Sequence, residues 1–68
     1  MAEENPTLIA TSRYVLLPVA SRLTGYTVKA IQRKIERGDW SEGQVWIRAP
    51  DGRILIDVQG YQRWVEGR

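Results

Sequence analysis

The stretch GYTVKAIQRKIERG, from Gly25 to Gly38, predicts one helix between two glycines. Thr27 is suited to begin that helix, because its hydroxyl oxygen can accept a backbone N–H bond from the first turn. Gly38 is suited to end it, because glycine adopts the left-handed conformation of a C-cap without steric cost. Four cations and a single acid, Glu36, lie in the stretch, so its charge is strongly one-sided.

The two faces of this helix differ in character. Val28, Ile31 and Ile35 share one side at 100° per residue and predict the buried face. The opposite, outward face consists of Tyr26, Lys29, Ala30, Arg33 and Arg37, with Lys34 on its flank. Cations four residues apart repel one another, and a polyanion would remove that repulsion. We therefore interpret this face as a DNA contact, with a solvated basic surface as the alternative.

A second, shorter helix is predicted just before the first. Arg13–Leu17 is rich in branched and aromatic residues and reads as an extended segment. Pro18 suits the first turn of a helix, where its missing N–H costs nothing. That helix ends at Thr24-Gly25. Two helices joined by a tight turn containing glycine match the helix-turn-helix pattern.

A β-hairpin and a last helix follow. Gln44–Arg48 and Arg53–Asp57 read as strands, and the intervening APDG has the residues of a tight turn. Asp57 is suited to cap a helix over Val58–Glu66, which Gly60 should weaken by roughly 0.5–1 kcal/mol. We expect Tyr61 and Trp64 to pack over the hairpin and help to close the core.

This order of elements predicts an α+β protein, a small winged helix-turn-helix with a β-hairpin wing and a C-terminal helix. We expect a flexible N-terminal tail over residues 1–12 and the DNA-binding domain over residues 13–68. Arg48 and Arg53 flank the tip of the wing and would reach phosphates or a minor groove. Ordinary charge at strand ends is the alternative explanation for these two arginines.

Composition narrows the classes of function. The chain has no cysteine and no histidine, so it lacks the usual general base and the usual zinc ligands. Asp51 and Asp57 are better explained as turn and cap residues than as catalytic acids. We expect no enzyme activity, no cofactor and no metal. Without a signal peptide or a long apolar run, we expect a bacterial cytoplasmic protein associated with the nucleoid.

The positive charge is concentrated in the middle of the chain. Residues 11–37 carry six cations and one acid, and eight of the ten cations in the whole chain are arginine. The planar fork of arginine suits phosphate oxygens and guanine edges better than the point charge of lysine. The alternative explanation is that the high arginine content reflects the base composition of the genome.

Three segments together resemble a known family: LTGYTVKAIQRKIERGDW (23–40), VWIRAPDGRILID (45–57) and GYQRWVE (60–66). They resemble the small phage and prophage excisionases, recombination directionality factors with a MerR-like winged helix. The resemblance covers about Leu17 to Glu66. It implies binding to repeated sites in attachment-site DNA by adjacent, cooperating copies. It also implies bending of that DNA and steering of a tyrosine-recombinase integrase toward excision.

The resemblance also assigns roles to residues. Thr27 to Arg37 would be the recognition helix, and the residues nearest the bases would be Tyr26, Thr27, Lys29, Ala30 and Arg33. Arg22 would touch phosphate, and Arg48 to Arg53 would form the wing. Many excisionases contact integrase through a flexible C-terminal tail. This sequence ends at Arg68, directly after its last predicted helix, and so departs from that pattern. Contact with integrase would need further residues or another surface of the domain.

Two other binding functions remain open from the sequence. A small phage transcriptional regulator could use the same winged helix, since a fold does not fix a function. A protein-interaction module would instead expose Tyr14, Trp40 or Trp64, which we expect to be core residues.

Overall fold

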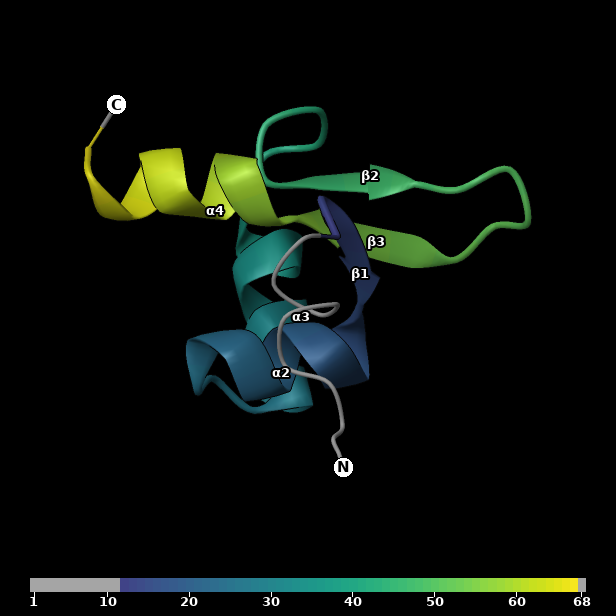
Figure 1. Ribbon diagram of the computed structural model, residues 1–68, viewed down its shortest axis with the longest axis horizontal. Coiled ribbons are helices and arrows are strands. Elements are labelled where there is room, and N and C mark those ends of the chain that lie inside the picture. The colour runs from purple at the N-terminus through teal and green to yellow at the C-terminus, as the bar shows by residue number, and fades with distance from the viewer. Residues whose placement is uncertain (1–11, 68) are drawn as a thin grey trace.

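The computed structural model describes residues 12–67, so most of the predicted tail lies outside the described residues. Three helices and three strands follow one another along the chain (Figure 1). Their bounds are β1 Tyr14–Leu16, α2 Leu17–Thr24, α3 Val28–Arg37, β2 Trp46–Arg48, β3 Ile54–Asp57 and α4 Val58–Val65. The α+β prediction is confirmed, and the arrangement is compatible with a winged-helix-like fold.

Helices α2 and α3 begin and end at the residues that the sequence marks. Pro18 lies in the first turn of α2, and Gly25 ends it with a left-handed φ of 86°. The Thr27 hydroxyl oxygen accepts a hydrogen bond of 3.0 Å from the backbone N–H of Ala30. Gly38 ends α3 with a φ of 80°. The helix-turn-helix is therefore fixed by local signals at the two ends of each helix.

The sheet has three antiparallel strands in the order β1-β3-β2. The hairpin of β2 and β3 is confirmed, and its turn is closed by the Gly52 N–H, which donates to the Ala49 carbonyl at 2.9 Å. The predicted strand start at Gln44 is wrong by two residues. Gln44 and Val45 instead donate their N–H groups to the Ser41 carbonyl in a turn, and β2 begins at Trp46.

The segment Arg13–Leu17 contributes the third strand, over Tyr14–Leu16. Tyr14 lies opposite Asp57, and Val15 lies opposite Ile56. The sequence predicts that this segment is extended but not where it pairs. Through this pairing, the start of the described chain is held against the wing and the start of α4.

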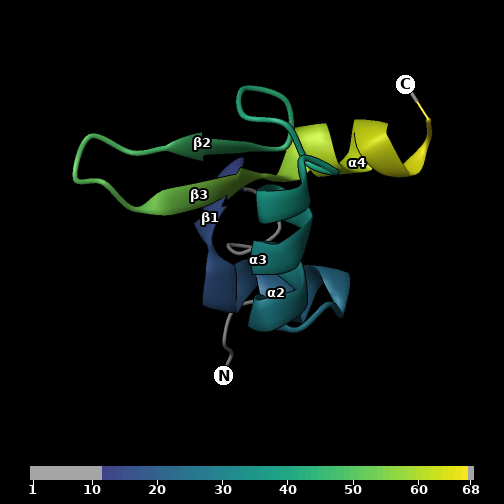
Figure 2. The ribbon, with the colours of Figure 1, turned by 180° about the vertical axis from the view of Figure 1, so that it is seen from behind.

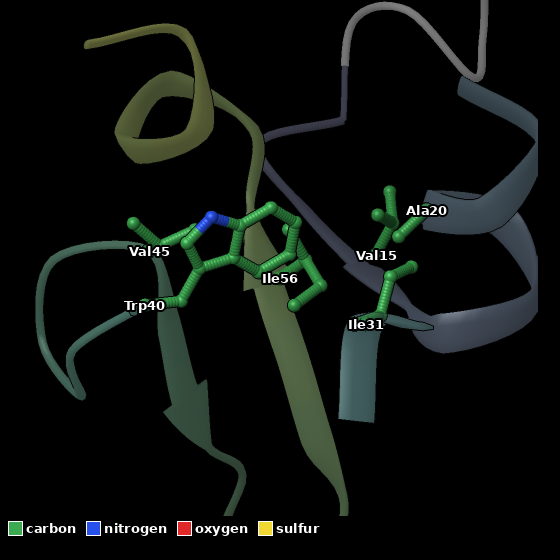
Figure 3. Packing of buried hydrophobic residues seen from close by; sticks show 6 residues of the cluster. All are labelled: Val15, Ala20, Ile31, Trp40, Val45 and Ile56. Atoms are coloured by element: carbon green, nitrogen blue, oxygen red, sulfur yellow. The ribbon is translucent and has the colours of Figure 1, made fainter. Parts of the chain in front are cut away.

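The core lies where the sheet meets the helices (Figure 3). Its buried hydrophobic residues are Val15, Ala20, Ile31, Trp40, Val45 and Ile56. Trp40, which follows α3, is 0% exposed and is the largest of them. The expectation that Tyr14 and Trp64 are core residues is wrong, because they are 42% and 36% exposed.

Helix α4 packs tightly on the turn before β2. Gly60 is buried, and a Cβ at this position would overlap the Gln44 carbonyl. Gly60 is therefore required for the close approach of α4, and the view that it merely weakens the helix is incomplete. Tyr61 and Trp64 pack on Trp40, at centroid distances of 5.8 and 5.5 Å.

Within residues 12–67, no helix is both long enough and apolar enough to cross a bilayer.

Candidate nucleic-acid interface

Helix α3 buries one face and exposes a basic one. Ile31 is 0% exposed and Ile35 packs against the core, as the periodicity predicts. Val28 is only half-buried. Lys29, Arg33 and Arg37 are exposed. In the view of Figure 2, α3 lies in front of α2, the wing extends to one side of it and α4 extends to the other.

The outward face of α3 holds a shallow hollow. Its lining consists of Tyr26, Ala30, Arg33, Lys34, Arg37 and Asp39. Thus the structure brings together five of the residues predicted to contact DNA. Ala30, the smallest of them, is half-buried between the cations and leaves room for a surface to approach. We call the exposed cations Lys29, Arg33 and Arg37 the basic face.

The basic face has no partner within the described chain. No ion pair among residues 12–67 involves Lys29, Arg33 or Arg37. Arg37 lies in the last turn of α3, where the helix dipole favours a cation. Lys29 and Arg33 have no such interaction with the helix dipole. The repulsion between them therefore remains, and a bound anion would relieve it.

Tyr26 and Lys34 are held by other aromatic side chains. The Tyr26 ring meets Trp40 edge to face at a centroid distance of 6.0 Å. The Lys34 ammonium lies 4.7 Å from the ring centroid of Tyr26 and 5.3 Å from that of Trp64. A cation over an aromatic face within about 6 Å is attracted by it. Lys34 thus connects α3 to α4, a role that helical spacing alone does not reveal.

The wing carries its two arginines at the tip. The Arg48 guanidinium donates a hydrogen bond of 2.9 Å to the Gly52 carbonyl and so is held across the end of the hairpin. The Arg53 side chain is 68% exposed, and its contact with Asp51 is long, at 3.8 Å. An ion pair that exposed contributes little. Arg53 can therefore turn to another anion at small cost.

Arg22 and Thr27 lie on either side of the turn that joins α2 to α3. Arg22 is exposed in the last turn of α2, six residues before α3 begins at Val28. Thr27 is exposed, and its oxygen accepts the capping bond from Ala30. Its hydroxyl proton is still available to donate to a ligand. Both residues lie next to the turn that positions α3.

Sequence reasoning missed the ion pair of Arg13 with Asp57. Nε of Arg13 lies 3.2 Å from Oδ1 of Asp57, which is buried and also caps α4 by accepting from the Gln59 N–H. Burial alone would raise the pKa of Asp57. The hydrogen bond from Arg13, backbone N–H groups of α4 and the arginine charge outweigh burial and lower that pKa. Only the pairing of β1 with β3 brings the two residues together, so no local signal could have found them.

Comparison with known proteins assigns a family. No curated protein and no solved structure matches the chain. A family model described as "Putative excisionase (DUF1233)" matches residues 7–68, which is nearly the whole sequence. That span includes the helix-turn-helix, the wing and α4, the same elements that carry the resemblance in the sequence. The chain therefore belongs to this excisionase family.

Proposed function

We propose that this protein binds duplex DNA at a phage attachment site and favours excision by a tyrosine-recombinase integrase. Helix α3 would enter the major groove as in a MerR-like winged helix, and the wing would reach the neighbouring backbone or minor groove. The proposed role is architectural and not enzymatic. The protein would act at the nucleoid in the bacterial cytoplasm, with integrase and neighbouring copies of itself as partners on the DNA.

The observation that carries this proposal is the basic face of α3, whose cations form no ion pair within residues 12–67. Lys29, Arg33 and Arg37 project from one side of a helix whose other side is anchored by Ile31. Arginine and lysine at these positions can neutralise phosphates and donate to base edges. Family membership makes DNA the expected polyanion.

The first test is a gel-shift titration against attachment-site DNA, with scrambled DNA as the control. Successive, cooperative complexes on the attachment site alone would support the proposal. Binding confined to a promoter would favour a transcriptional regulator with the same fold. No binding to either DNA at low salt would overturn the proposal.

The salt dependence tests how the protein binds. About five cations are expected to meet phosphates: Arg22, Lys29, Arg37, Arg48 and Arg53. Each phosphate contact contributes about 0.9 to the slope of log K against log salt, so we expect a slope of about −4 to −5. A slope near zero would exclude docking of α3 in a groove.

Arg33 tests base recognition separately from phosphate binding. We expect Arg33→Ala to cost roughly 1–3 kcal/mol at the specific site and to flatten the preference for it over scrambled DNA. An equal loss on both DNAs would make Arg33 a phosphate contact instead.

A further inference from the structure

A hollow lies between α2 and α4, on a part of the surface that the candidate nucleic-acid interface does not use. We call it the α2/α4 hollow, and its volume is about 210 Å³. Leu23 of α2 lines it from one side, and Val58 and Tyr61 of α4 line it from the other. The buried residues Val15 and Ile56 also line it, so the hollow reaches the core.

The chemistry of the α2/α4 hollow indicates an apolar occupant. No charged side chain of residues 12–67 lines it. The Thr24 hydroxyl also lies in its wall, but it donates to the Ala20 carbonyl at 2.8 Å and accepts from the Tyr26 N–H at 3.2 Å. An apolar cavity of about 150 Å³ is enough to bind benzene. The hollow can therefore take an aliphatic side chain.

The start of the described chain lies beside this hollow. The N–H of Val58 donates to the Arg13 carbonyl at 2.8 Å, so the chain before Arg13 begins at the wall of the hollow. Leu8, Ile9 and Ala10 stand next to one another in that preceding chain. The four residues from Ile9 to Arg13 span at most about 14 Å. The segment 8–10 can thus reach the hollow without a longer linker.

The short connection favours this segment over any other apolar occupant. A short tether gives an effective concentration in the millimolar range, which a second copy or a partner protein must exceed. The segment is also the apolar part of its surroundings, since residues 3–7 are Glu, Glu, Asn, Pro and Thr. The family model covers it as well, because its match begins at residue 7.

We infer that residues 8–10 pack into the α2/α4 hollow of their own chain, with the side chains of Leu8 and Ile9 against Leu23, Val58 and Tyr61. The segment would tie the first helix of the helix-turn-helix to α4. None of the residues predicted to contact DNA lines the hollow, so the inference does not depend on the proposed function. It limits the predicted flexible tail to the residues before this segment.

A spin label tests where the segment lies. The chain has no cysteine, so Asn5→Cys gives one attachment site for a nitroxide, three residues before Leu8. Broadening of the backbone amide signals of the full chain would be measured by nuclear magnetic resonance. We expect strong broadening at Leu23 and little at Gly52, in the turn at the tip of the wing. Adding Leu8→Ser and Ile9→Ser should reduce the broadening at Leu23 severalfold.

Urea titration of the unlabelled chain measures the same contact independently. Leu8→Ser combined with Ile9→Ser should lower the equilibrium constant for folding about tenfold or more, because apolar side chains leave the hollow. Val65→Ser is the control, since Val65 is 58% exposed, and should change the constant less than about threefold. In a Leu23→Ala background the effect of the double substitution should shrink, because part of the wall is missing.

Three outcomes would overturn the inference. The first is broadening at Leu23 no stronger than at Gly52, which would leave the hollow without this segment even if the serine variants fail to fold. The second is an effect of the double substitution no larger than that of Val65→Ser. The third is broadening at Leu23 when spin-labelled protein is mixed with unlabelled, isotope-enriched protein, which would make a second copy the occupant. Absence of DNA binding together with the expected broadening would overturn the proposed function alone.

Discussion

The region around Trp40 and the tip of the wing differ in what surrounds their side chains. Trp40 is fully buried and meets Tyr26, Tyr61 and Trp64 edge to face, with Lys34 over the cluster. We call these five residues the aromatic cluster. At the wing tip, Arg48 and Arg53 are exposed, and their contacts are with other residues of the same hairpin.

This difference between the buried cluster and the exposed wing tip indicates that the chain uses separate sets of residues for folding and for binding. A domain of this size buries only about 60% of the surface that its unfolded chain exposes, less than larger domains do, and so has little stability to spare. The aromatic cluster concentrates apolar contact on one side of α3. The cations on the other side of α3 and at the wing contribute little to folding, through the helix dipole at Arg37 and the hydrogen bond from Arg48 to the Gly52 carbonyl. We therefore expect substitutions in the cluster to change stability and substitutions at the wing to change binding.

The largest effect is expected for Trp40→Ala. Truncating a buried tryptophan typically costs about 3–5 kcal/mol, which is comparable to the whole stability of a domain this small. We expect the variant to be largely unfolded by circular dichroism and urea titration. Trp64→Ala is the control, since Trp64 lies in the same cluster but is 36% exposed. An equal loss for the two variants would mean that Trp40 is not the centre of the cluster.

Gly60→Ala comes next. Alanine improves helix propensity by up to about 1 kcal/mol, but here its Cβ would overlap the Gln44 carbonyl and force α4 away from the turn. We expect a net loss of about 1–3 kcal/mol in the free energy of unfolding. Gln62→Ala, at an exposed position of the same helix, should change it by less than about 0.5 kcal/mol. A stabilised Gly60→Ala variant would contradict the close approach.

Asp57 makes stability depend on pH. Its folded-state pKa lies below the ordinary value of 3.8, so it contributes stability above that value and loses it as the pH falls through the folded pKa. Asp57→Asn should keep the cap but weaken this acid dependence in urea titrations below about pH 5. Asp57→Ala should in addition lose the cap of α4, at about 0.5–2 kcal/mol.

Arg13, the ion-pair partner of Asp57, supplies the control for the urea titrations at low pH. Arg13→Gln should weaken the same acid dependence, and combining it with Asp57→Asn should weaken it no further. Additive effects of the two substitutions would mean that the pair does not act as a unit.

Lys34 is expected to have a smaller effect on stability and none on the number of phosphate contacts. Lys34→Met keeps the aliphatic stem but removes the cation from the rings, and should cost about 0.5–2 kcal/mol in urea titrations. The slope of log K against log salt should stay unchanged, whereas Lys29→Met should flatten it by about 0.9. A flatter slope for Lys34→Met would add Lys34 to the set of phosphate contacts.

Arg53→Gln should have the smallest effect on folding. Its contact with Asp51 is long and exposed, so we expect the free energy of unfolding to change by less than about 0.5 kcal/mol. The same variant should flatten the salt dependence of DNA binding by about 0.9. A clear loss of stability would show that the wing is part of the folding core.

Local signals were enough to predict the helix-turn-helix and the hairpin. Gly25, Thr27 and Gly38 act within one turn of chain, so their meaning does not depend on the rest of the fold. The periodicity of α3 likewise predicted which of its cations are exposed. These features depend on spacing, which a sequence displays directly.

The remaining features depend on contacts between distant residues. Nothing near Arg13 indicates that it meets Asp57, and nothing near Gly60 indicates that it lies against Gln44. In the sequence, Lys34 does not differ from the other cations of α3. Its contact with Trp64 depends on the packing of α4. In each case tertiary packing determines which residue is the partner, and the local sequence does not indicate it.

Strand β3 passes into α4 without a loop, and Asp57 is both the last residue of the strand and the cap of the helix. The bonds that Asp57 makes to Arg13 and Gln59 stiffen this junction, and Gly60 is confined by the backbone beneath it. We therefore expect the wing and α4 to move together as one rigid unit. A displacement of the wing tip on binding should then be accompanied by a displacement of α4 at the other end of β3.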